Sequence, residues 1–232
     1  MSALAGRVAV VSGASRGIGA AAAEALAGEG AFVVRLARTL VPARHAAGAD
    51  IRCDLADAAA VAEAGAAILS AHGAPEVVVS NAGAFLLRPF EATTVADLDV
   101  QLGVNLRGAF ALARALLPAM REAGRGVYLH VGSVADHHAF AGNAAYAASK
   151  FALRGLHETL LAEYRGTGVR CTLLSPGPTD TAAWDPVDPE ATAGLTPRAR
   201  MLRAADVAEA VRWLATRPPH VQVDWLRMGP VG

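Results

Sequence analysis

The sequence predicts a single α/β domain, residues 1–232, in which a mostly parallel, seven-stranded sheet carries helices on both faces. Short β-branched runs alternate with long Ala/Leu/Glu segments of helical spacing along the chain, which is typical of repeated strand–helix–strand units. The short runs are continuously apolar, as expected for parallel strands that are covered on both faces. Because no linker, repeat or low-complexity segment divides the chain, these units are expected to form one doubly wound domain.

The elements follow in chain order. The apolar runs predict strands at residues 8–11, 32–36, 51–53, 77–79, 127–131, 169–174 and 221–223. The segments between them predict helices at residues 19–27, 56–71, 95–121, 144–165 and 205–216. An irregular stretch at residues 176–198 contains five prolines. Long irregular segments within a compact domain are often lids over a site, so we expect a short substrate lid at about residues 182–204.

Composition and charge exclude several classes of function. The chain has 21 basic and 21 acidic residues, so broad electrostatic attraction to nucleic acid or to a membrane surface is not expected. No apolar run reaches the ~18 residues of a membrane span, and Arg7 and Gly13 interrupt any signal-peptide core. Cys53 and Cys171 lie in apolar stretches and are expected to be buried, reduced thiols. We therefore expect a cytoplasmic protein with no metal site.

A glycine-rich turn connects the first predicted strand to the first helix. It reads SGASRGIG from Ser12 to Gly19, with the spacing G-x-x-x-G-x-G. Glycines let the backbone approach a pyrophosphate, and the following helix offers free N–H groups and a positive dipole end to the phosphates. A glycine-rich turn alone is a weak signal, but its place between a strand and a helix predicts a dinucleotide site.

The end of the second predicted strand indicates which dinucleotide binds. NAD sites usually place an acidic residue there to bind the ribose hydroxyls. Here the positions are Ala37, Arg38 and Thr39, and Arg16 in the glycine turn can approach from the other side. Because guanidinium groups match phosphate oxygens, we predict a preference for NADP(H). The alternative is that Arg38 is an ordinary solvated loop charge.

Four polar residues predict proton-transfer chemistry. Tyr146 and Lys150 are four residues apart in a predicted helix and therefore share one face. Ser133 follows the strand at 127–131, and Asn105 lies within the helix at 95–121. A free tyrosine has a pKa of ~10, and a nearby cation such as Lys150 is expected to lower it. With Ser133 holding a substrate oxygen beside the Tyr146 hydroxyl, these groups suit acid–base chemistry on a carbonyl or an alcohol.

These ordered motifs resemble the short-chain dehydrogenase/reductase family in its classical, NADP-preferring form, and the resemblance covers nearly the whole chain. It implies a Rossmann-type three-layer fold. Asn105, Ser133, Tyr146 and Lys150 match the family's catalytic tetrad, which implies that Tyr146 is the general acid/base and that Lys150 also binds the nicotinamide ribose. Asn105 would hold a backbone kink and a water leading to Lys150. Ser12 stands where the family's glycine motif has Thr.

The resemblance also implies a set of cofactor contacts. Asp54 and Leu55 would contact the adenine, and Thr181 with the backbone near Thr179 would hold the carboxamide. Ser80 replaces the first Asn of the family's NNAG motif, which we interpret as a structural variation. The full set of expected contacts is Gly13, Ser15, Arg16, Gly17, Ile18, Gly19, Arg38, Thr39, Asp54, Leu55, Asn81, Ala82, Gly83, Tyr146, Lys150, Pro176, Gly177, Thr179 and Thr181.

Further residues have more than one interpretation. His137 and His138 either line a substrate pocket or lie in a solvated loop, whereas His130 lies in an apolar strand and is interpreted as a core histidine. Trp184 either covers an apolar substrate or anchors the lid. Phe85 and Phe140 are pocket candidates by position. The segment after residue 181 is short for a lid, and residues 218–224 lack the Asp-Gly-Gly ending of many family members.

Together these patterns predict an NADP(H)-dependent oxidoreductase that transfers a hydride between the nicotinamide and a carbonyl or secondary alcohol, with Tyr146 as general acid/base. Two alternatives stay open: a catalytically silent NADP(H)-binding sensor, and a cofactor-free enzyme such as a dehalogenase on the same scaffold. The small-molecule substrate could be a ketone, a keto acid or ester, a hydroxy acid, a sugar or a steroid. Ala/Leu faces at residues 95–120 and 144–164 permit helix pairing in a homodimer or homotetramer.

Overall fold

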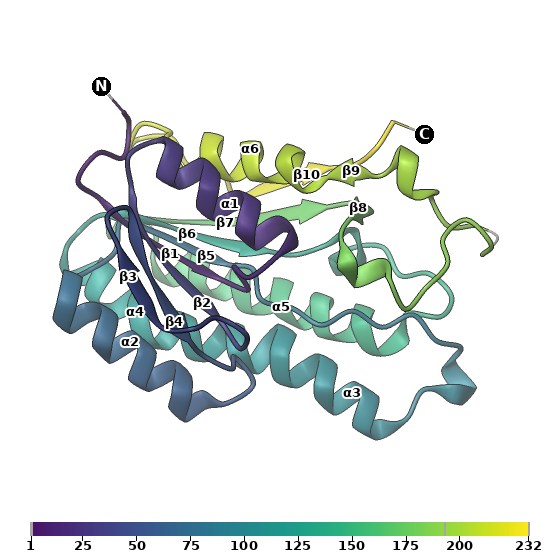
Figure 1. Ribbon diagram of the computed structural model, residues 1–232. Coiled ribbons are helices and arrows are strands. Elements are labelled where there is room, and N and C mark those ends of the chain that lie inside the picture. The colour runs from purple at the N-terminus through teal and green to yellow at the C-terminus, as the bar shows by residue number, and fades with distance from the viewer. Residues whose placement is uncertain (1, 193, 232) are drawn as a thin grey trace.

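The chain folds around one central sheet of eight strands. The computed structural model describes residues 2–192 and 194–231. The strand order is β10-β7-β6-β5-β1-β2-β4-β3, and every neighbouring pair is parallel except the β3–β4 pair at one edge (Figure 1). The sheet therefore has the mostly parallel, Rossmann-type arrangement that the sequence predicts, with one additional antiparallel strand at its edge.

The elements have the following bounds. The sheet strands are β1 (Val8–Ser12), β2 (Phe32–Ala37), β3 (Ala43–His45), β4 (Gly48–Arg52), β5 (Val77–Ser80), β6 (Gly126–Val131), β7 (Val169–Pro176) and β10 (Trp225–Met228). A separate pair is formed by β8 (Thr179–Asp180) and β9 (Leu202–Arg203). The helices are α1 (Gly17–Gly28), α2 (Ala58–His72), α3 (Val95–Leu102), α4 (Ala109–Glu122), α5 (Ala144–Glu163) and α6 (Ala204–Ala215).

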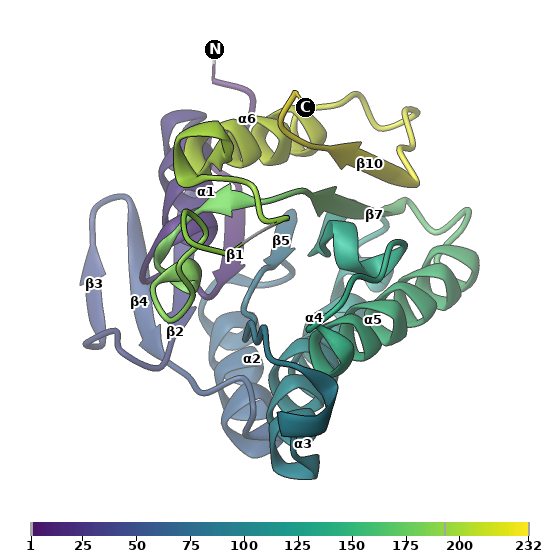
Figure 2. The same ribbon diagram turned by 90° about the vertical axis from the view of Figure 1, so that its right-hand side faces the viewer.

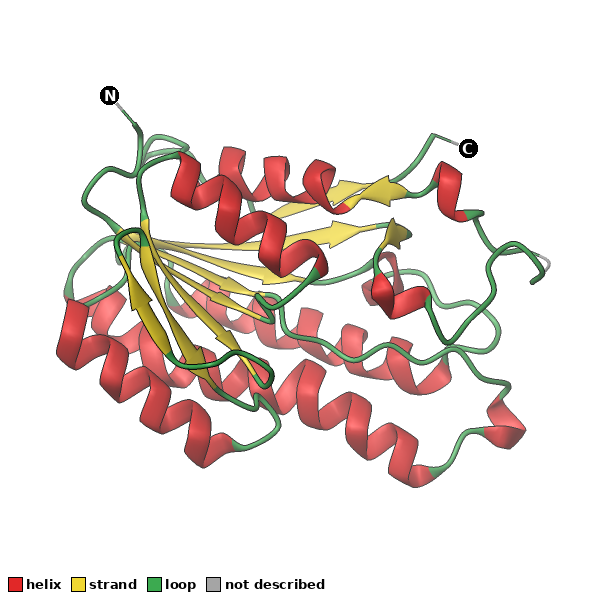
Figure 3. Ribbon diagram, viewed as in Figure 1, coloured by secondary structure: helices red, strands yellow, loops and turns green. Residues whose placement is uncertain are grey.

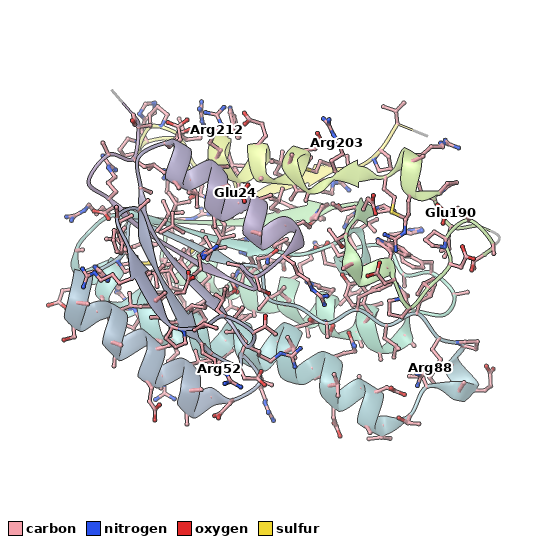
Figure 4. The ribbon with its side chains drawn as sticks, in the orientation of Figure 1. Glu24, Arg52, Arg88, Glu190, Arg203 and Arg212 are labelled. Carbon is pink, nitrogen blue, oxygen red and sulfur yellow. The ribbon has the colours of Figure 1, made fainter. Side chains whose placement is uncertain are left out.

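The sheet lies between two layers of helices, which Figure 3 shows as yellow strands between red helices. Alternate strand residues point to opposite faces. In β1, Ala9 and Val11 belong to the core shared with α1 and α6, whereas Val10 belongs to the core shared with α2 and α4. Burial of each of the two valines contributes ~1.5–3 kcal/mol before entropy losses. On the outer side, Arg212 of α6 pairs with Glu29 beyond the end of α1 and ties the two helices together (Figure 4).

Local sequence signals set several helix starts. Asp57 caps α2, because its carboxylate accepts hydrogen bonds from the N–H groups of Ala59 and Ala60. Thr94 and Asp97 form a reciprocal capping box at the start of α3. Helix α1 has no such cap, because Arg16 precedes it without a capping side-chain hydrogen bond. The N-terminal N–H groups of a helix of this kind can bind an anion.

The strand order reverses direction between β1 and β5. From β1 the chain proceeds to β2 and β4 on one side, and β5, β6, β7 and β10 lie on the other. In open parallel sheets this switch point leaves a crevice at the carboxyl ends of the strands, where ligands bind. Figure 2 views the molecule from that end, with β8 and the segment that leads to α6 in front of the sheet. The strand order alone therefore predicts that the candidate site lies at the carboxyl ends of β1 and β5.

Three boundary predictions were wrong. The last strand is Trp225–Met228, not residues 221–223, because the 221–223 backbone is bound by side chains of β7, with Thr172 donating to the Val223 carbonyl. The strand predicted at 51–53 is β4, which begins at Gly48 and pairs with an unpredicted β3. The helix predicted at 95–121 is interrupted by a π-helical turn at Gly103–Gly108.

Two other kinds of structure are absent from the described part of the chain. Within residues 2–192 and 194–231, no helix is long and apolar enough to cross a membrane. Across the same residues, no group of three or more His, Cys, Asp or Glu side chains is arranged to hold a metal ion. Many of the polar residues singled out in the sequence gather instead at the switch point of the sheet.

Candidate active site

The glycine turn after β1 is folded tightly against its neighbours. Gly13 and Gly17 have positive φ values of 66° and 57°, a conformation that other residues rarely adopt. A Cβ at Gly19 would lie 2.3 Å from the Gly13 carbonyl oxygen, and one at Gly13 would lie 2.8 Å from the Cα of Ala82. The turn therefore needs glycine at these positions. It presents bare backbone and the start of α1 to the crevice, which fits the pyrophosphate of a dinucleotide.

Ser12 joins this turn to the end of β5. Its hydroxyl accepts hydrogen bonds from the N–H groups of Asn81 (3.0 Å) and Ala82 (3.1 Å) and donates to the Val79 carbonyl (3.4 Å). The Asn81 amide donates back to the Ser12 carbonyl at 3.0 Å. The replacement of Thr by Ser at position 12 thus keeps the hydroxyl that holds the two loops together.

The residues expected near the ribose of the adenosine half are open to solvent. Arg16 and Arg38 are both exposed, and neither has an ion pair within the described part of the chain. Arg35 is different, because it forms a two-pronged ion pair with Asp50 at 2.6 Å. The position at the end of β2 is Ala37, so no acidic side chain stands there to bind a ribose diol. The two available guanidinium groups fit a phosphate on the ribose.

A cavity of about 620 Å³ opens beside the glycine turn at the switch point. Ten of the predicted site residues line it: Ile18, Asn81, Gly83, Ser133, Tyr146, Lys150, Pro176, Gly177, Thr179 and Thr181. The others lie outside the lining of the cavity: Gly13, Ser15, Arg16, Gly17, Gly19, Arg38, Thr39, Asp54, Leu55, Ala82 and Asn105. Its position spans the glycine turn and the Tyr146 region, so one bound molecule can contact both.

Ser133, Tyr146 and Lys150 meet at one wall of the cavity. Ser133 follows β6, and Tyr146 and Lys150 lie on the first turns of α5. The Lys150 amine is buried, donates to the Val131 carbonyl at 3.1 Å, and lies 5.8 Å from the centre of the Tyr146 ring. The phenol, the serine hydroxyl and the ammonium group therefore lie close together, as the sequence spacing predicts.

The pKa values at this wall are controlled mainly by burial. Burial raises the pKa of Tyr146 to about 12, Ser133 counteracts this through a hydrogen bond, and the charge of Asp136 adds to the rise. Burial lowers the pKa of Lys150 to about 8, while Asp136 acts in the opposite direction. The pKa of Tyr146 in the chain alone is therefore raised, opposite to the lowering expected from the sequence, because loss of solvation is the largest effect.

Asn105 lies behind the cavity in the π-helical turn. It is 1% exposed. Its carbonyl accepts from the Ala84 N–H at 2.7 Å, and its amide donates to the Ala84 carbonyl and to the Ser149 hydroxyl. Ser149 in turn donates to the Tyr146 carbonyl at 2.7 Å. Asn105 thus connects the loop after β5 to the helical turn that carries Tyr146. The helix irregularity lies at the residue where the resemblance implies a kink.

Asp136 is a site residue that the sequence analysis missed. It is fully buried, and its carboxylate accepts from the Ser133 N–H (3.0 Å) and the Ser175 hydroxyl (2.6 Å). His137 pairs with its other oxygen at 2.7 Å. The Ser175 hydroxyl also accepts from the indole N–H of Trp225 in β10. The Ser-x-x-Asp spacing of a capping box was the available sequence signal.

Aromatic side chains form the wall of the cavity beyond Tyr146. Phe85 meets the Tyr146 ring edge-on, with centroids 5.0 Å apart, and its other side lies 4.9 Å from the ring of Trp184. Phe140 and His138 also line the cavity, whereas His137 is paired with Asp136 instead. His130 is fully buried beside His157, as expected for a core histidine.

Residues 182–192 and 194–203 follow β8, and Ala183, Trp184 and Leu195 among them line one side of the cavity. Thr181 lies against the glycine turn, since a Cβ at Gly17 would come within 3.3 Å of its side chain. Arg198 fixes the segment by pairing with both Asp180 and Asp185 at 2.8 Å. Figure 4 shows Glu190 at the outer end of this segment, where its carboxylate accepts from the Arg198 N–H.

The doubly wound sheet, the glycine turn and the cavity at the switch point define a Rossmann-type nucleotide-dependent enzyme. Residues 7–192 match the short chain dehydrogenase family. D-threitol dehydrogenase of Mycolicibacterium smegmatis is 36% identical over 224 residues, 91% of this chain and 86% of that protein. 2-(R)-hydroxypropyl-CoM dehydrogenase of Xanthobacter autotrophicus is 37% identical over 229 residues, 90% of this chain and 91% of that protein.

A solved structure gives the same assignment. A metagenomic short-chain oxidoreductase in complex with NADP superposes with a TM-score of 0.82 at 34% identity, over 97% of this chain and 98% of that one. The chain belongs to the short-chain dehydrogenase family, and it is an oxidoreductase of the kind that acts on alcohols and their carbonyl counterparts with a nicotinamide cofactor.

Proposed function

We propose that the enzyme transfers a hydride between NADP(H) and a carbonyl or secondary alcohol, with Tyr146 as general acid/base. The observation that carries this proposal is the grouping of Ser133, Tyr146 and Lys150 at one wall of a cavity that continues to the glycine turn. When bound, NADPH supplies the hydride that reduces the carbonyl carbon and is itself oxidised to NADP⁺. The residues of the chain then have to hold the carbonyl oxygen and provide one proton to it.

Ser133 and Tyr146 are suited to those two tasks. The Ser133 hydroxyl donates to the carbonyl oxygen and holds it beside the phenol. Burial keeps the pKa of Tyr146 at about 12, so the phenol carries its proton at neutral pH and is ready to donate it. A developing alkoxide is more basic than a phenolate, which makes this proton transfer favourable. In the oxidative direction Tyr146 takes the proton back, and the Lys150 ammonium stabilises the phenolate.

We infer a preference for NADP(H) over NAD(H). Arg16 and Arg38 are exposed at the edge of the crevice, and Ala37 leaves β2 without the acid that would bind a ribose diol. The relative solved with NADP supports the same choice. The remaining expected cofactor contacts then follow the glycine turn, the loops after β4 and β5, and the loop after β7.

We also propose a homodimer or homotetramer in the cytoplasm. Val95, Val100, Phe110 and Phe151 are 44–75% exposed on α3, α4 and α5, where helices of two subunits could pair. The two free cysteines are buried, which fits reduced thiols, and burial raises the pKa of Cys53 to about 11.

The Tyr146→Phe variant tests the proposed chemistry. It should bind NADPH as the wild type does, and its carbonyl reduction should fall by ~10²–10⁴-fold, because positioned acid–base catalysis contributes about that much. NADPH binding is measured by cofactor fluorescence and turnover by loss of absorbance with a varied carbonyl panel. Tyr164→Phe, at the other end of α5, is the matched control. Near-full activity of Tyr146→Phe would contradict the role of the phenol, and NADPH binding by the wild type without any turnover would favour the sensor alternative.

A further inference from the structure

The cavity wall beyond Tyr146 is made of carbon-rich side chains. The rings of Tyr146, Phe85 and Trp184 follow one another at centroid distances of 5.0 and 4.9 Å. Phe140 and Leu195 add further apolar surface. A substrate whose carbonyl oxygen lies beside the Tyr146 hydroxyl must therefore place one of its substituents against this wall.

The polar atom of Trp184 does not face the substrate. Its indole N–H donates to the Thr179 carbonyl at 3.1 Å, and the residue is 9% exposed. The indole thus presents only ring carbons to the cavity. Aromatic walls of this kind favour aryl or alkyl groups, which gain contact area without losing hydrogen bonds to water.

The cavity also lacks a free positive charge for an anionic substrate. Among the described lining residues, Lys150 is the only Lys, Arg, Asp or Glu, and its amine is held by the Val131 carbonyl beneath the Tyr146 ring. The nearby Arg198 is committed to Asp180 and Asp185. His138, the other basic side chain in the lining, is exposed to solvent. A carboxylate or phosphate buried against the aromatic wall would lose its hydration without gaining a lysine or arginine partner, which opposes binding.

We propose, on the basis of the function proposed above, that the substrate is an uncharged ketone, or the corresponding secondary alcohol, with an aryl or branched alkyl substituent. Phe85 and Trp184 determine this specificity by forming the wall that the substituent contacts. Keto acids are poor substrates because they bring an uncompensated carboxylate charge. Polyols are poor substrates because the aromatic rings cannot form hydrogen bonds with their additional hydroxyl groups.

The first test uses two substrates with the same reacting ketone. Benzoylformate carries a carboxylate where its ethyl ester carries an uncharged ethoxycarbonyl group, and both keep the same phenyl ketone. With NADPH, kcat/KM for the ester should exceed that for the acid by at least about 100-fold, since the aromatic wall offers a buried carboxylate no lysine or arginine partner. In the oxidative direction with NADP⁺, 1-phenylethanol should exceed threitol by a similar factor.

Variants test the assignment of the wall. Phe85→Leu and Trp184→Leu should lower the preference for 1-phenylethanone over propanone by about 10-fold or more, chiefly through KM, because ring contacts contribute to binding. Phe90→Leu is the matched control, since Phe90 is 74% exposed and does not line the cavity. Leu195→Arg adds a cation to the wall without removing a ring, and it should raise kcat/KM for benzoylformate about 10-fold. Calorimetric binding of 1-phenylethanol to the Tyr146→Phe protein with NADP⁺ gives a readout that does not need turnover.

The outcomes distinguish the proposed substrate class from the proposed NADP(H)-dependent function on which it rests. Equal use of benzoylformate and its ester, or a wild-type preference for threitol, would overturn the substrate class while leaving NADP(H)-dependent reduction intact. An unchanged phenyl preference in both wall variants would overturn the role of Phe85 and Trp184. Failure of every carbonyl to oxidise NADPH would instead overturn the proposed function, and the substrate class with it.

Discussion

Substitution of Asp136 offers the most specific test of how the active site is held together. Asp136→Ala removes the acceptor for the part-buried Ser133 N–H and the buried Ser175 hydroxyl, and it removes the partner of His137. Each buried donor left without a partner costs ~1–3 kcal/mol, so the free energy of unfolding should fall by about 2–6 kcal/mol. In a domain of this size 1 kcal/mol corresponds to ~2–4 °C in Tm, so a decrease on the order of 10 °C is expected.

Asp136→Asn removes the charge but keeps an acceptor oxygen. The charge of Asp136 raises the pKa values of both Tyr146 and Lys150, so both should fall in this variant. Carbonyl reduction requires protonated Tyr146, and its rate declines as the pH rises through the pKa of that phenol. The declining limb of the pH–rate profile should therefore move to lower pH.

Thermal unfolding and pH–rate profiles with NADPH as cofactor measure the two effects. Glu24→Gln, on the solvent face of α1, is the control for loss of a carboxylate charge (Figure 4). If Asp136→Ala unfolds within 2 °C of the wild type, the hydrogen-bond argument is wrong. If the high-pH limb of Asp136→Asn coincides with that of the wild type, the electrostatic argument is wrong.

Three further predictions concern stability, cofactor choice and assembly. Burial lowers the pKa of His130 to about 3, below the ~6.5 of an unfolded histidine, so the unfolded chain takes up the proton first and stability should fall as the pH drops below ~6.5. The loss should reach about 2 kcal/mol at pH 5, measured by urea unfolding. Arg38→Ala should weaken NADPH binding by about 10–100-fold in a fluorescence titration, because a charge-assisted hydrogen bond contributes ~1.5–3 kcal/mol. The same variant should bind NADH as the wild type does. The double substitution Phe110→Glu and Phe151→Glu should yield a monomer by light scattering, while the wild type is a dimer or tetramer.

Each of these has an outcome that contradicts it. Constant stability between pH 8 and pH 5 would mean that His130 takes up its proton in the folded state as easily as in the unfolded one. Equal weakening of NADPH binding by Arg165→Ala, an exposed arginine beyond α5, would show a general charge effect and not a phosphate contact. A monomeric wild-type mass at micromolar concentration would remove the basis for pairing through α3, α4 and α5.

The sequence was sufficient for the fold because its signals are local and repeated. Continuous apolar runs mark buried parallel strands, and helical segments between them leave few topologies. The boundaries that failed depend on long-range contacts. The last strand starts at Trp225 because the side chains of Arg170 and Thr172 in β7 bind the backbone before it. The β3–β4 hairpin forms at an edge, where short polar strands carry little periodicity.

The positions of the main side chains of the candidate site were also predictable from local sequence signals. Spacing within one helix placed Tyr146 beside Lys150, and the strand end placed Ser133 nearby. The pKa of Tyr146 could not be predicted, because burial depends on how Phe85 and the lid pack around the ring. Asp136 was missed because its carboxylate is hydrogen-bonded to Ser175, a contact between residues that are distant in the sequence.

Trp225 gives the last strand of the sheet a role in the active site. The guanidinium groups of Arg154 and Arg227 lie 4.4 and 4.9 Å from the centre of its indole. Its N–H donates to Ser175, which is hydrogen-bonded to Asp136. Truncating the carboxyl terminus before this strand would thus disturb the chemistry as well as the sheet edge. Figure 1 shows β1 and β10 as separate strands of the sheet, so an affinity tag at the amino end avoids the strand that carries Trp225.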